Sequence, residues 1–133
     1  MNFAATPETE PFWASARDEV LSVPFCLRCE RFFLYPRLFC PRCWSDAVEW
    51  RRVSGRGRVA SYTVVRRQPP GVDDDVPYVV AVIELDEGVQ LMSHVVDFPG
   101  DPTTIPLDLP VEVAFDHART LARPVFRQRA PAP

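Results

Sequence analysis

The hydrophobic pattern changes from a helical period to a strand period along the chain. Over residues 6–21 apolar side chains recur at roughly helical spacing, at Phe12, Trp13, Ala16, Val20 and Leu21. Thr9 or Glu10 is a suitable cap, and Pro11 suits the first helical position. Pro24 cannot continue a helix, so we expect the helix to end before it.

From Val48 onward the residues are typical of short strands. The predicted strands run over residues 48–53, 58–65, 78–85, 89–96, 111–115 and 124–127. Residues 54–57 supply a turn, residues 86–88 predict a hairpin, and residues 97–110, with four prolines, predict a longer connection. The five strands from residue 58 onward, with the long connection before the fourth of them, fit a small closed barrel of the OB type, which leaves no open sheet edge.

The predicted hairpin has two apolar faces. Alternation places one set of side chains on one face, namely Val79, Ala81, Ile83 and Leu85. It places a second set on the other face, namely Tyr78, Val80, Val82 and Glu84. Since both faces are mostly apolar, we expect the helix, the cysteine-containing segment or a partner subunit to cover the outer one.

The cysteines form two Cys-x-x-Cys pairs separated by ten residues. A two-residue gap lets both thiolates of a tight turn point at one ion, and two such turns complete a tetrahedron of sulfurs. A short hairpin over residues 31–39 would bring the second pair back to the first. The pattern therefore predicts a zinc ribbon whose ligands are Cys26, Cys29, Cys40 and Cys43.

Two other roles for the cysteines are open at this point. Disulfides need an oxidising compartment, but residues 1–8 have neither a basic n-region nor a long apolar h-region. A tetrahedral sulfur site also suits iron, which would make the protein an electron carrier.

Large apolar side chains crowd the cysteines, at Phe25, Phe32, Phe33, Leu34, Tyr35, Leu38, Phe39 and Trp44. A module this small has little interior and depends on metal and aromatic cover. More aromatics are present than one zinc site needs, so we expect some to face the barrel or another chain. Phe12 and Trp13 of the helix either cover the protein's own core or anchor a partner.

At 133 residues and 15.1 kDa the chain is long enough for one domain with a metal-stapled module. We expect a mainly β protein with a helical segment over residues 1–23, a zinc ribbon over 24–47 and an OB-fold over 48–133, whose last residues, 130–133, form a disordered tail. No apolar run approaches the length of a membrane span. We therefore expect a cytoplasmic protein with no membrane partner.

Charge is distributed unevenly. All 15 basic residues are arginine, and the stretch 28–67 holds ten of them against Glu30, Asp46 and Glu49, a balance of +7. The remainder carries five arginines and fifteen acids, which leaves −10. This asymmetry suggests an anionic partner or an acidic protein surface. Arginines that only solvate a small exposed module would give the same pattern.

Candidates for catalysis are scarce. His94 and His117 lie in no metal-ligand spacing, and Gly55-Arg56-Gly57 lacks the remaining positions of a phosphate-binding fingerprint. The expected metal uses all four thiols. We therefore expect no catalytic residues and no enzyme activity of this chain alone.

The order of several motifs resembles the DUF35 family, whose members combine an N-terminal helix, a rubredoxin-like zinc ribbon and an OB-fold. The motifs are Pro11-Phe12-Trp13, Cys26-x-x-Cys29, the stretch 36–43 with its Cys-Pro-x-Cys, Ser54-Gly55-Arg56-Gly57-Arg58-Val59, Ser61-Tyr62-Thr63-Val64-Val65 and Pro77-Tyr78-Val79-Val80-Ala81. The resemblance spans nearly the whole chain. Trp44 departs from it, because relatives often have glycine there, so we expect a different turn after the last ligand.

The resemblance implies a partner of the thiolase superfamily in a hetero-oligomer with two copies of each chain. Some relatives assist acetyl-CoA condensation, and others join lipid-transfer-protein-like aldolases that cleave CoA thioesters of steroid side chains. An acyl-CoA contact would use arginine forks for the phosphates, at Arg56, Arg58 and Arg66. The expected partner interface consists of Phe12, Trp13, Phe33, Tyr35 and Trp44.

Binding of single-stranded nucleic acid is the alternative function, because zinc ribbons and OB-folds do this elsewhere. Against it stand the net charge of −3 and the pI near 5.3. The predicted strands also lack a run of exposed aromatics interleaved with basic residues.

Overall fold

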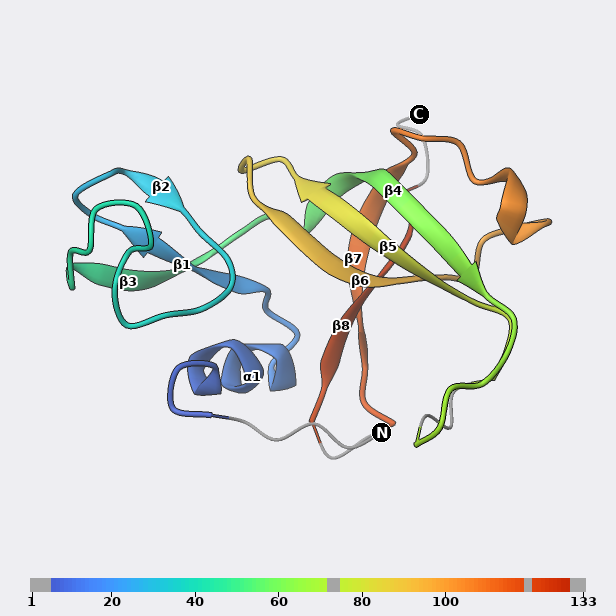
Figure 1. Cartoon of the computed structure of the whole chain (residues 1–133), viewed down its shortest axis with the longest axis horizontal. Helices are drawn as coiled ribbons and strands as arrows, with labels where there is room; N and C mark the ends of the chain where they lie inside the picture. Colours follow the sequence, from blue (N-terminus) through green and yellow to red (C-terminus); the bar gives the residue numbers. More distant parts are fainter. Residues whose placement is uncertain (1–5, 72–74, 119–120, 130–133) are drawn as a thin grey trace.

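The computed structural model describes residues 6–71, 75–118 and 121–129. A single α-helix precedes a three-stranded antiparallel sheet and a closed five-stranded barrel (Figure 1). The sheet has the order β2-β1-β3, and its elements, with the helix before them, are α1 (Glu10–Arg17), β1 (Ser22–Cys26), β2 (Arg31–Phe32) and β3 (Val48–Arg52). The predicted mainly β fold, with a helix, a four-cysteine module and a barrel of the OB type, is confirmed.

The barrel has the order β4-β5-β6-β8-β7, and β7 pairs back onto β4. Its strands are β4 (Arg56–Val65), β5 (Tyr78–Leu85), β6 (Gln90–Val96), β7 (Pro110–Asp116) and β8 (Arg123–Gln128), with a 3-10 turn, η1 (Pro102–Thr104), in the long connection. The β6–β8 pair is parallel and the others are antiparallel. The predicted hairpin is present, and Gly88, with φ of 90°, makes its tight turn possible.

The helix is shorter than predicted because its C-terminus is closed by a local motif. Glu19 has φ of 58° and donates its N–H to the carbonyl of Ala16 at 2.9 Å. The N–H of Val20 reaches back to the carbonyl of Ser15, also at 2.9 Å, which completes a Schellman motif. Pro24 therefore does not end the helix but lies inside β1. No helix among the described residues has the length and apolar character needed to span a membrane.

The stretch that begins at Val48 belongs to the ribbon sheet, although the sequence pattern grouped it with the barrel strands. It forms β3, which pairs with β1 from Cys26 opposite Val48 to Ser22 opposite Arg52. All five residues of β1 are buried, so its backbone polar groups need a strand on each side. Gly57, expected in a turn, likewise lies within β4.

One hydrophobic core fills the barrel and extends into the ribbon. Val59, Ile83, Val111 and Phe126 are fully buried in its interior. Along β5 every second side chain points inward, as the alternation predicted. Leu21 and Val23 belong to the same core, so β1 joins the two units through packing as well as through the chain.

The outer face of β5 and β6 keeps exposed apolar surface. Val80 and Val82 are half-buried, and Met92, which pairs with Val82 across the strands, is 70% exposed. The helix and the ribbon therefore do not complete the cover that the two-faced hairpin predicted.

Gly57 gives a test of strand packing. An added Cβ would lie 2.4 Å from the carbonyl oxygen of Glu84 on β5, and this oxygen cannot move without disturbing the ladder. We expect Gly57→Ala to lower the free energy of unfolding by about 2 kcal/mol in urea denaturation. Ser61→Ala, at an exposed position of the same strand, should change it by less than about 0.5 kcal/mol. Equal stability of the two variants would contradict this packing.

Candidate functional site

The sulfur atoms of the four cysteines lie together. The Sγ atoms of Cys26 and Cys43 are 3.6 Å apart, those of Cys29 and Cys40 are 3.9 Å apart, and all four fall within 4.8 Å of one another. A tetrahedron with Zn–S bonds of about 2.3 Å has edges of about 3.8 Å, whereas a disulfide needs about 2.05 Å. The four predicted cysteines are thus positioned to bind one metal ion in a tetrahedral thiolate site, and they are not paired as disulfides.

Backbone N–H groups point at two of the sulfurs. Cys29 donates its N–H to the Sγ of Cys26 at 3.3 Å, and Arg42 donates to the Sγ of Cys40 at 3.4 Å. These bonds stabilise thiolate charge within each turn and hold the sulfurs in place. The site therefore owes its geometry to the spacing within each Cys-x-x-Cys pair.

The thiols differ in acidity before a metal binds. Backbone N–H groups, first that of Cys43 and then that of Arg42, lower the pKa of Cys40 to about 6. A hydrogen bond with the thiol of Cys43 is the largest cause that raises the pKa of Cys29 to about 12. An incoming metal must displace the protons that remain on the cluster.

The two turns have the same backbone geometry. The residue after each pair donates its N–H to the carbonyl of the first cysteine, Glu30 to Cys26 at 2.8 Å and Trp44 to Cys40 at 2.9 Å. Glu30 has φ of 56° and Trp44 has φ of 61°. The turn after the last ligand therefore has the geometry of its counterpart in this chain, including the left-handed conformation that favours glycine.

The expected interface residues have different surroundings. Phe33 is only 6% exposed and packs against Cys26 and Cys40. Its assignment to an exposed interface is corrected, because the ribbon needs an apolar side chain behind its metal site. Tyr35 and Trp44 are exposed, at 62% and 76%.

The two aromatics of α1 divide their roles. Phe12 packs against the barrel core, and its ring meets that of Trp13 edge-on at 5.1 Å. Trp13 lines a groove next to the helix. Phe12 therefore mainly fixes the helix on the barrel, while Trp13 contributes to a surface.

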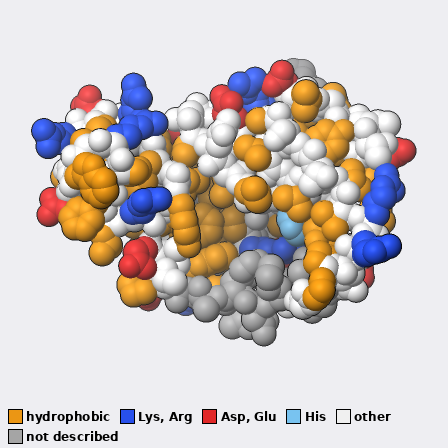
Figure 2. All heavy atoms as spheres, viewed as in Figure 1, with side chains coloured by type: hydrophobic (Ala, Val, Ile, Leu, Met, Phe, Trp, Pro, Cys, Tyr) orange, Lys and Arg blue, Asp and Glu red, His pale blue; other side chains and the backbone are white. Residues whose placement is uncertain are grey.

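Four exposed apolar residues lie within two positions of a metal ligand in the sequence. We call this set the ribbon tip, and its members are Leu27, Leu38, Phe39 and Trp44. Figure 2 shows hydrophobic side chains on the lobe at the left, with basic side chains beside them. Sequence reasoning did not select the first three as interface residues. Their adjacency to the ligand turns was the available signal, because a residue held beside a ligand on a tight turn has no interior to enter.

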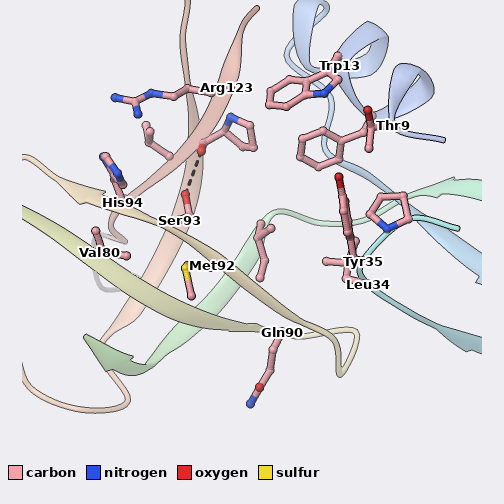
Figure 3. Close-up of a pocket in the computed structure, with 15 residues that line it drawn as sticks. Thr9, Trp13, Leu34, Tyr35, Val80, Gln90, Met92, Ser93, His94 and Arg123 are labelled. Atoms are coloured by element: carbon pink, nitrogen blue, oxygen red, sulfur yellow. Dashed lines mark hydrogen bonds between the residues drawn. The ribbon is translucent and has the colours of Figure 1, made fainter. Parts of the chain in front are cut away.

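A groove of about 690 Å³ lies between α1, the ribbon and the barrel. Its apolar lining includes Phe12, Trp13, Leu34, Tyr35, Met92 and Val125. In Figure 3, Trp13 and Tyr35 face Met92, His94 and Arg123 across it, and Figure 2 shows the same hollow between the two lobes. Sequence reasoning missed the groove because its walls come from distant segments.

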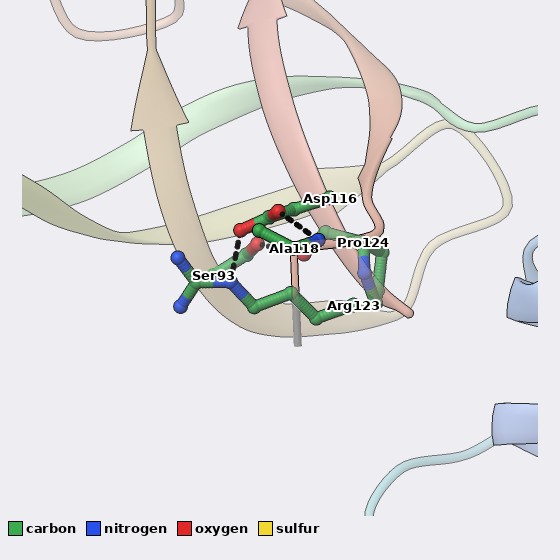
Figure 4. Close-up of polar contacts among 5 residues, drawn as sticks. All are labelled: Ser93, Asp116, Ala118, Arg123 and Pro124. Atoms are coloured by element: carbon green, nitrogen blue, oxygen red, sulfur yellow. Dashed lines mark hydrogen bonds and ion pairs between the residues drawn. The ribbon is translucent and has the colours of Figure 1, made fainter. Parts of the chain in front are cut away.

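Polar contacts fix the barrel wall of the groove. Ser93 donates its buried hydroxyl to the carbonyl of Pro124 at 2.9 Å, and Arg123 pairs through Nε with a carboxylate oxygen of Asp116 at 3.1 Å (Figure 4). The other carboxylate oxygen of Asp116 accepts the N–H of Ala118 at 2.9 Å. These bonds tie β6, β7 and β8 together, so the Ser93 hydroxyl is engaged in structure.

The three arginines expected to hold CoA phosphates do not form one site. Arg58 pairs with Glu84 at 3.1 Å and Asp108 at 2.6 Å, and the hydrogen bond to Glu84 is the main cause that raises its pKa. Arg56 begins β4 and Arg66 follows its last residue. A ten-residue strand spans roughly 30 Å, so these two side chains start from opposite ends of it.

Both halves of the chain match known protein families. Residues 13–49 match the family described as the rubredoxin-like zinc ribbon domain of ChsH2. Residues 50–116 match the C-terminal OB-fold domain of ChsH2.

Individual relatives support the same grouping. A DUF35 domain-containing scaffold protein of Methanothermobacter thermautotrophicus is 38% identical over 95 residues, which cover 71% of this chain and 70% of that protein. A probable enoyl-CoA hydratase alpha subunit of Thermomonospora curvata is 34% identical over 122 residues, which cover 90% of this chain but only 37% of that protein. A chain of the solved Ltp2-ChsH2(DUF35) aldolase is similar with a TM-score of 0.85 and 30% identity, over 96% of this chain and 98% of that one.

Removal of one ligand tests the metal site. We expect Cys26→Ser or Cys40→Ser to lose zinc and solubility together, because a structural zinc site contributes about 10 kcal/mol or more to folding. Zinc content by elemental analysis and the soluble yield measure both effects. Arg42→Ala, between two ligands but exposed, is the control and should keep one zinc per chain. A folded, soluble Cys→Ser variant would contradict a structural role.

Proposed function

Because the chain belongs to the DUF35 family, in which a ChsH2-type zinc ribbon precedes an OB-fold, we propose that it is a non-catalytic subunit of a thiolase-superfamily enzyme. Its partner is a thiolase or a lipid-transfer-protein-like aldolase that acts on acyl-CoA thioesters, including those of steroid side chains. The complex contains two copies of each chain. The observation that carries the proposal is the similarity over 96% of the chain to a chain of the Ltp2-ChsH2(DUF35) aldolase.

The chemistry of the site supports a role in assembly. The four cysteines would supply all four ligands of a tetrahedral zinc ion, which would leave no coordination position open to a substrate. At the groove, the buried hydroxyl of Ser93 donates a hydrogen bond to the carbonyl of Pro124. We assign bond making and breaking to the partner.

The surface supports the same role. Large exposed apolar side chains occur at the ribbon tip, at Tyr35 and at Met92. Exposed apolar patches mark sites of protein or ligand contact in soluble proteins. We assign Trp13, Tyr35 and Trp44 to the interface, with Phe12 as the support of Trp13.

Contact with the acyl-CoA is assigned to the groove. Its volume lies in the range of ligand sites, and its lining is mostly apolar. Arg58 is already paired with two acids of its own chain. An acyl group that extends from the partner's active site fits this lining better than a CoA phosphate would.

Co-expression tests the subunit role. A tagged form of this chain should co-purify with a thiolase-superfamily protein of the same genome, identified by mass spectrometry. That protein, produced alone, should be insoluble or inactive on acyl-CoA, and addition of this chain should restore turnover. Full activity of the partner by itself would rule the proposal out.

Met92→Arg tests the use of the groove. The side chain is 70% exposed, so the variant should fold with an unchanged melting temperature. A charge at the groove should lower turnover of acyl-CoA by the complex by about tenfold or more, because an apolar acyl group would bury the charge without a partner. Leu107→Arg, in the long connection, is the control: this side chain is similarly exposed and does not line the groove. Similar turnover of the two variants would exclude this use of the groove.

A further inference from the structure

The backbone conformation at Trp44 is unfavourable for a tryptophan. Its φ of 61° lies in the left-handed region, which is an outlier for a bulky side chain. Its N–H is bonded to the carbonyl of Cys40 at 2.9 Å, so the turn cannot relax without disturbing the metal site. The side chain nevertheless stays 76% exposed. Burial within this chain therefore does not offset the backbone cost.

The metal site holds the neighbours of Trp44 in place as well. Leu27 follows the first ligand, Phe39 precedes the third and Trp44 follows the fourth. Because the four sulfurs lie within 4.8 Å of one another, these three residues all start close to one point. The ribbon tip is therefore a preorganised apolar surface, which loses little side-chain freedom on binding.

Charge around the ribbon tip points to the nature of its partner surface. Arg28, Arg37 and Arg42 are exposed beside the tip residues, and between residues 27 and 44 the only acid is Glu30. With Arg31, this stretch carries four arginines against Glu30, so the formal charge of −2 on a four-thiolate zinc site leaves a balance of +1. A surface of matching chemistry is apolar at its centre and carries carboxylates at its edge.

We propose that the ribbon tip docks into an apolar recess bordered by carboxylates on the thiolase-superfamily partner, with Trp44 as the anchor residue. This inference rests on the proposed function and adds the surface, the anchor and the chemistry of the opposing site. Nucleic acid fits less well, because Leu27 and Leu38 cannot stack on bases and the chain carries a net charge of −3.

Two glycine substitutions at equivalent positions separate docking from folding. Trp44→Gly removes the anchor and relieves its left-handed backbone. Glu30→Gly relieves the same conformation in the other turn, where φ is 56°, and removes an exposed side chain without an aromatic ring. Both variants should keep one zinc per chain and should not melt below the wild type.

The full-length chains are co-expressed with the thiolase-superfamily protein, purified through the tag and diluted, and mass photometry gives the Kd of each complex. Trp44→Gly should raise the Kd at least about tenfold, as loss of an interface anchor does, whereas Glu30→Gly should leave it within about twofold. A tenfold increase without loss of zinc or melting temperature would not follow from a structural role.

Three outcomes overturn the inference. If the wild type forms a complex and Trp44→Gly forms it equally well, the anchor assignment fails while the proposed function stands. If Trp44→Gly loses zinc, Trp44 is structural. If a labelled single-stranded oligonucleotide binds the wild type but not Trp44→Gly at physiological salt, the tip is a nucleic-acid site. Failure of the wild type to bind any thiolase-superfamily chain would instead refute the proposed function, and the partner assignment with it.

Discussion

Coordination of one metal ion by four thiols is the constraint on which the other features depend. The ribbon's own core consists of little more than Cys26, Phe33 and Cys40, too few side chains to hold three short strands. The metal fixes both turns and thereby the position of β1 between β2 and β3. Since Leu21 and Val23 also enter the barrel core, the metal site helps to orient the ribbon against the barrel.

The same constraint decides which side chains remain outside. Residues beside the ligands on the tight turns have too small a ribbon core to pack into. Trp44 and Phe39 are therefore displayed, whereas Phe33 fills the space behind the sulfurs. The groove arises in a similar way, where α1 and the loop at Tyr35 meet the barrel wall but do not cover Met92.

Part of the arginine excess supports the fold. Arg58 bridges Glu84 and Asp108 across barrel segments, and Arg51 lies 3.8 Å above the ring of Phe25 and pairs with Glu49. Each ion pair is weak where it is exposed. These two arginines of the basic stretch 28–67 therefore act within the chain and are not free to bind an anion.

The sequence by itself determined the metal ligands, the hairpin and the barrel strands, because these depend on short-range spacing: two residues between thiolates, and alternation along β5. Only the tertiary structure decided which sheet Val48 enters, that Phe33 is buried and that the groove exists. These outcomes depend on contacts between segments far apart in the chain. The end of the helix was predicted too late for a local reason. Glu19 adopts φ of 58°, and glutamate is not a residue type that favours this conformation. Residue spacing specifies a site whose ligands lie close together in the sequence. The exposure of a side chain, in contrast, depends on how all the other elements pack around it.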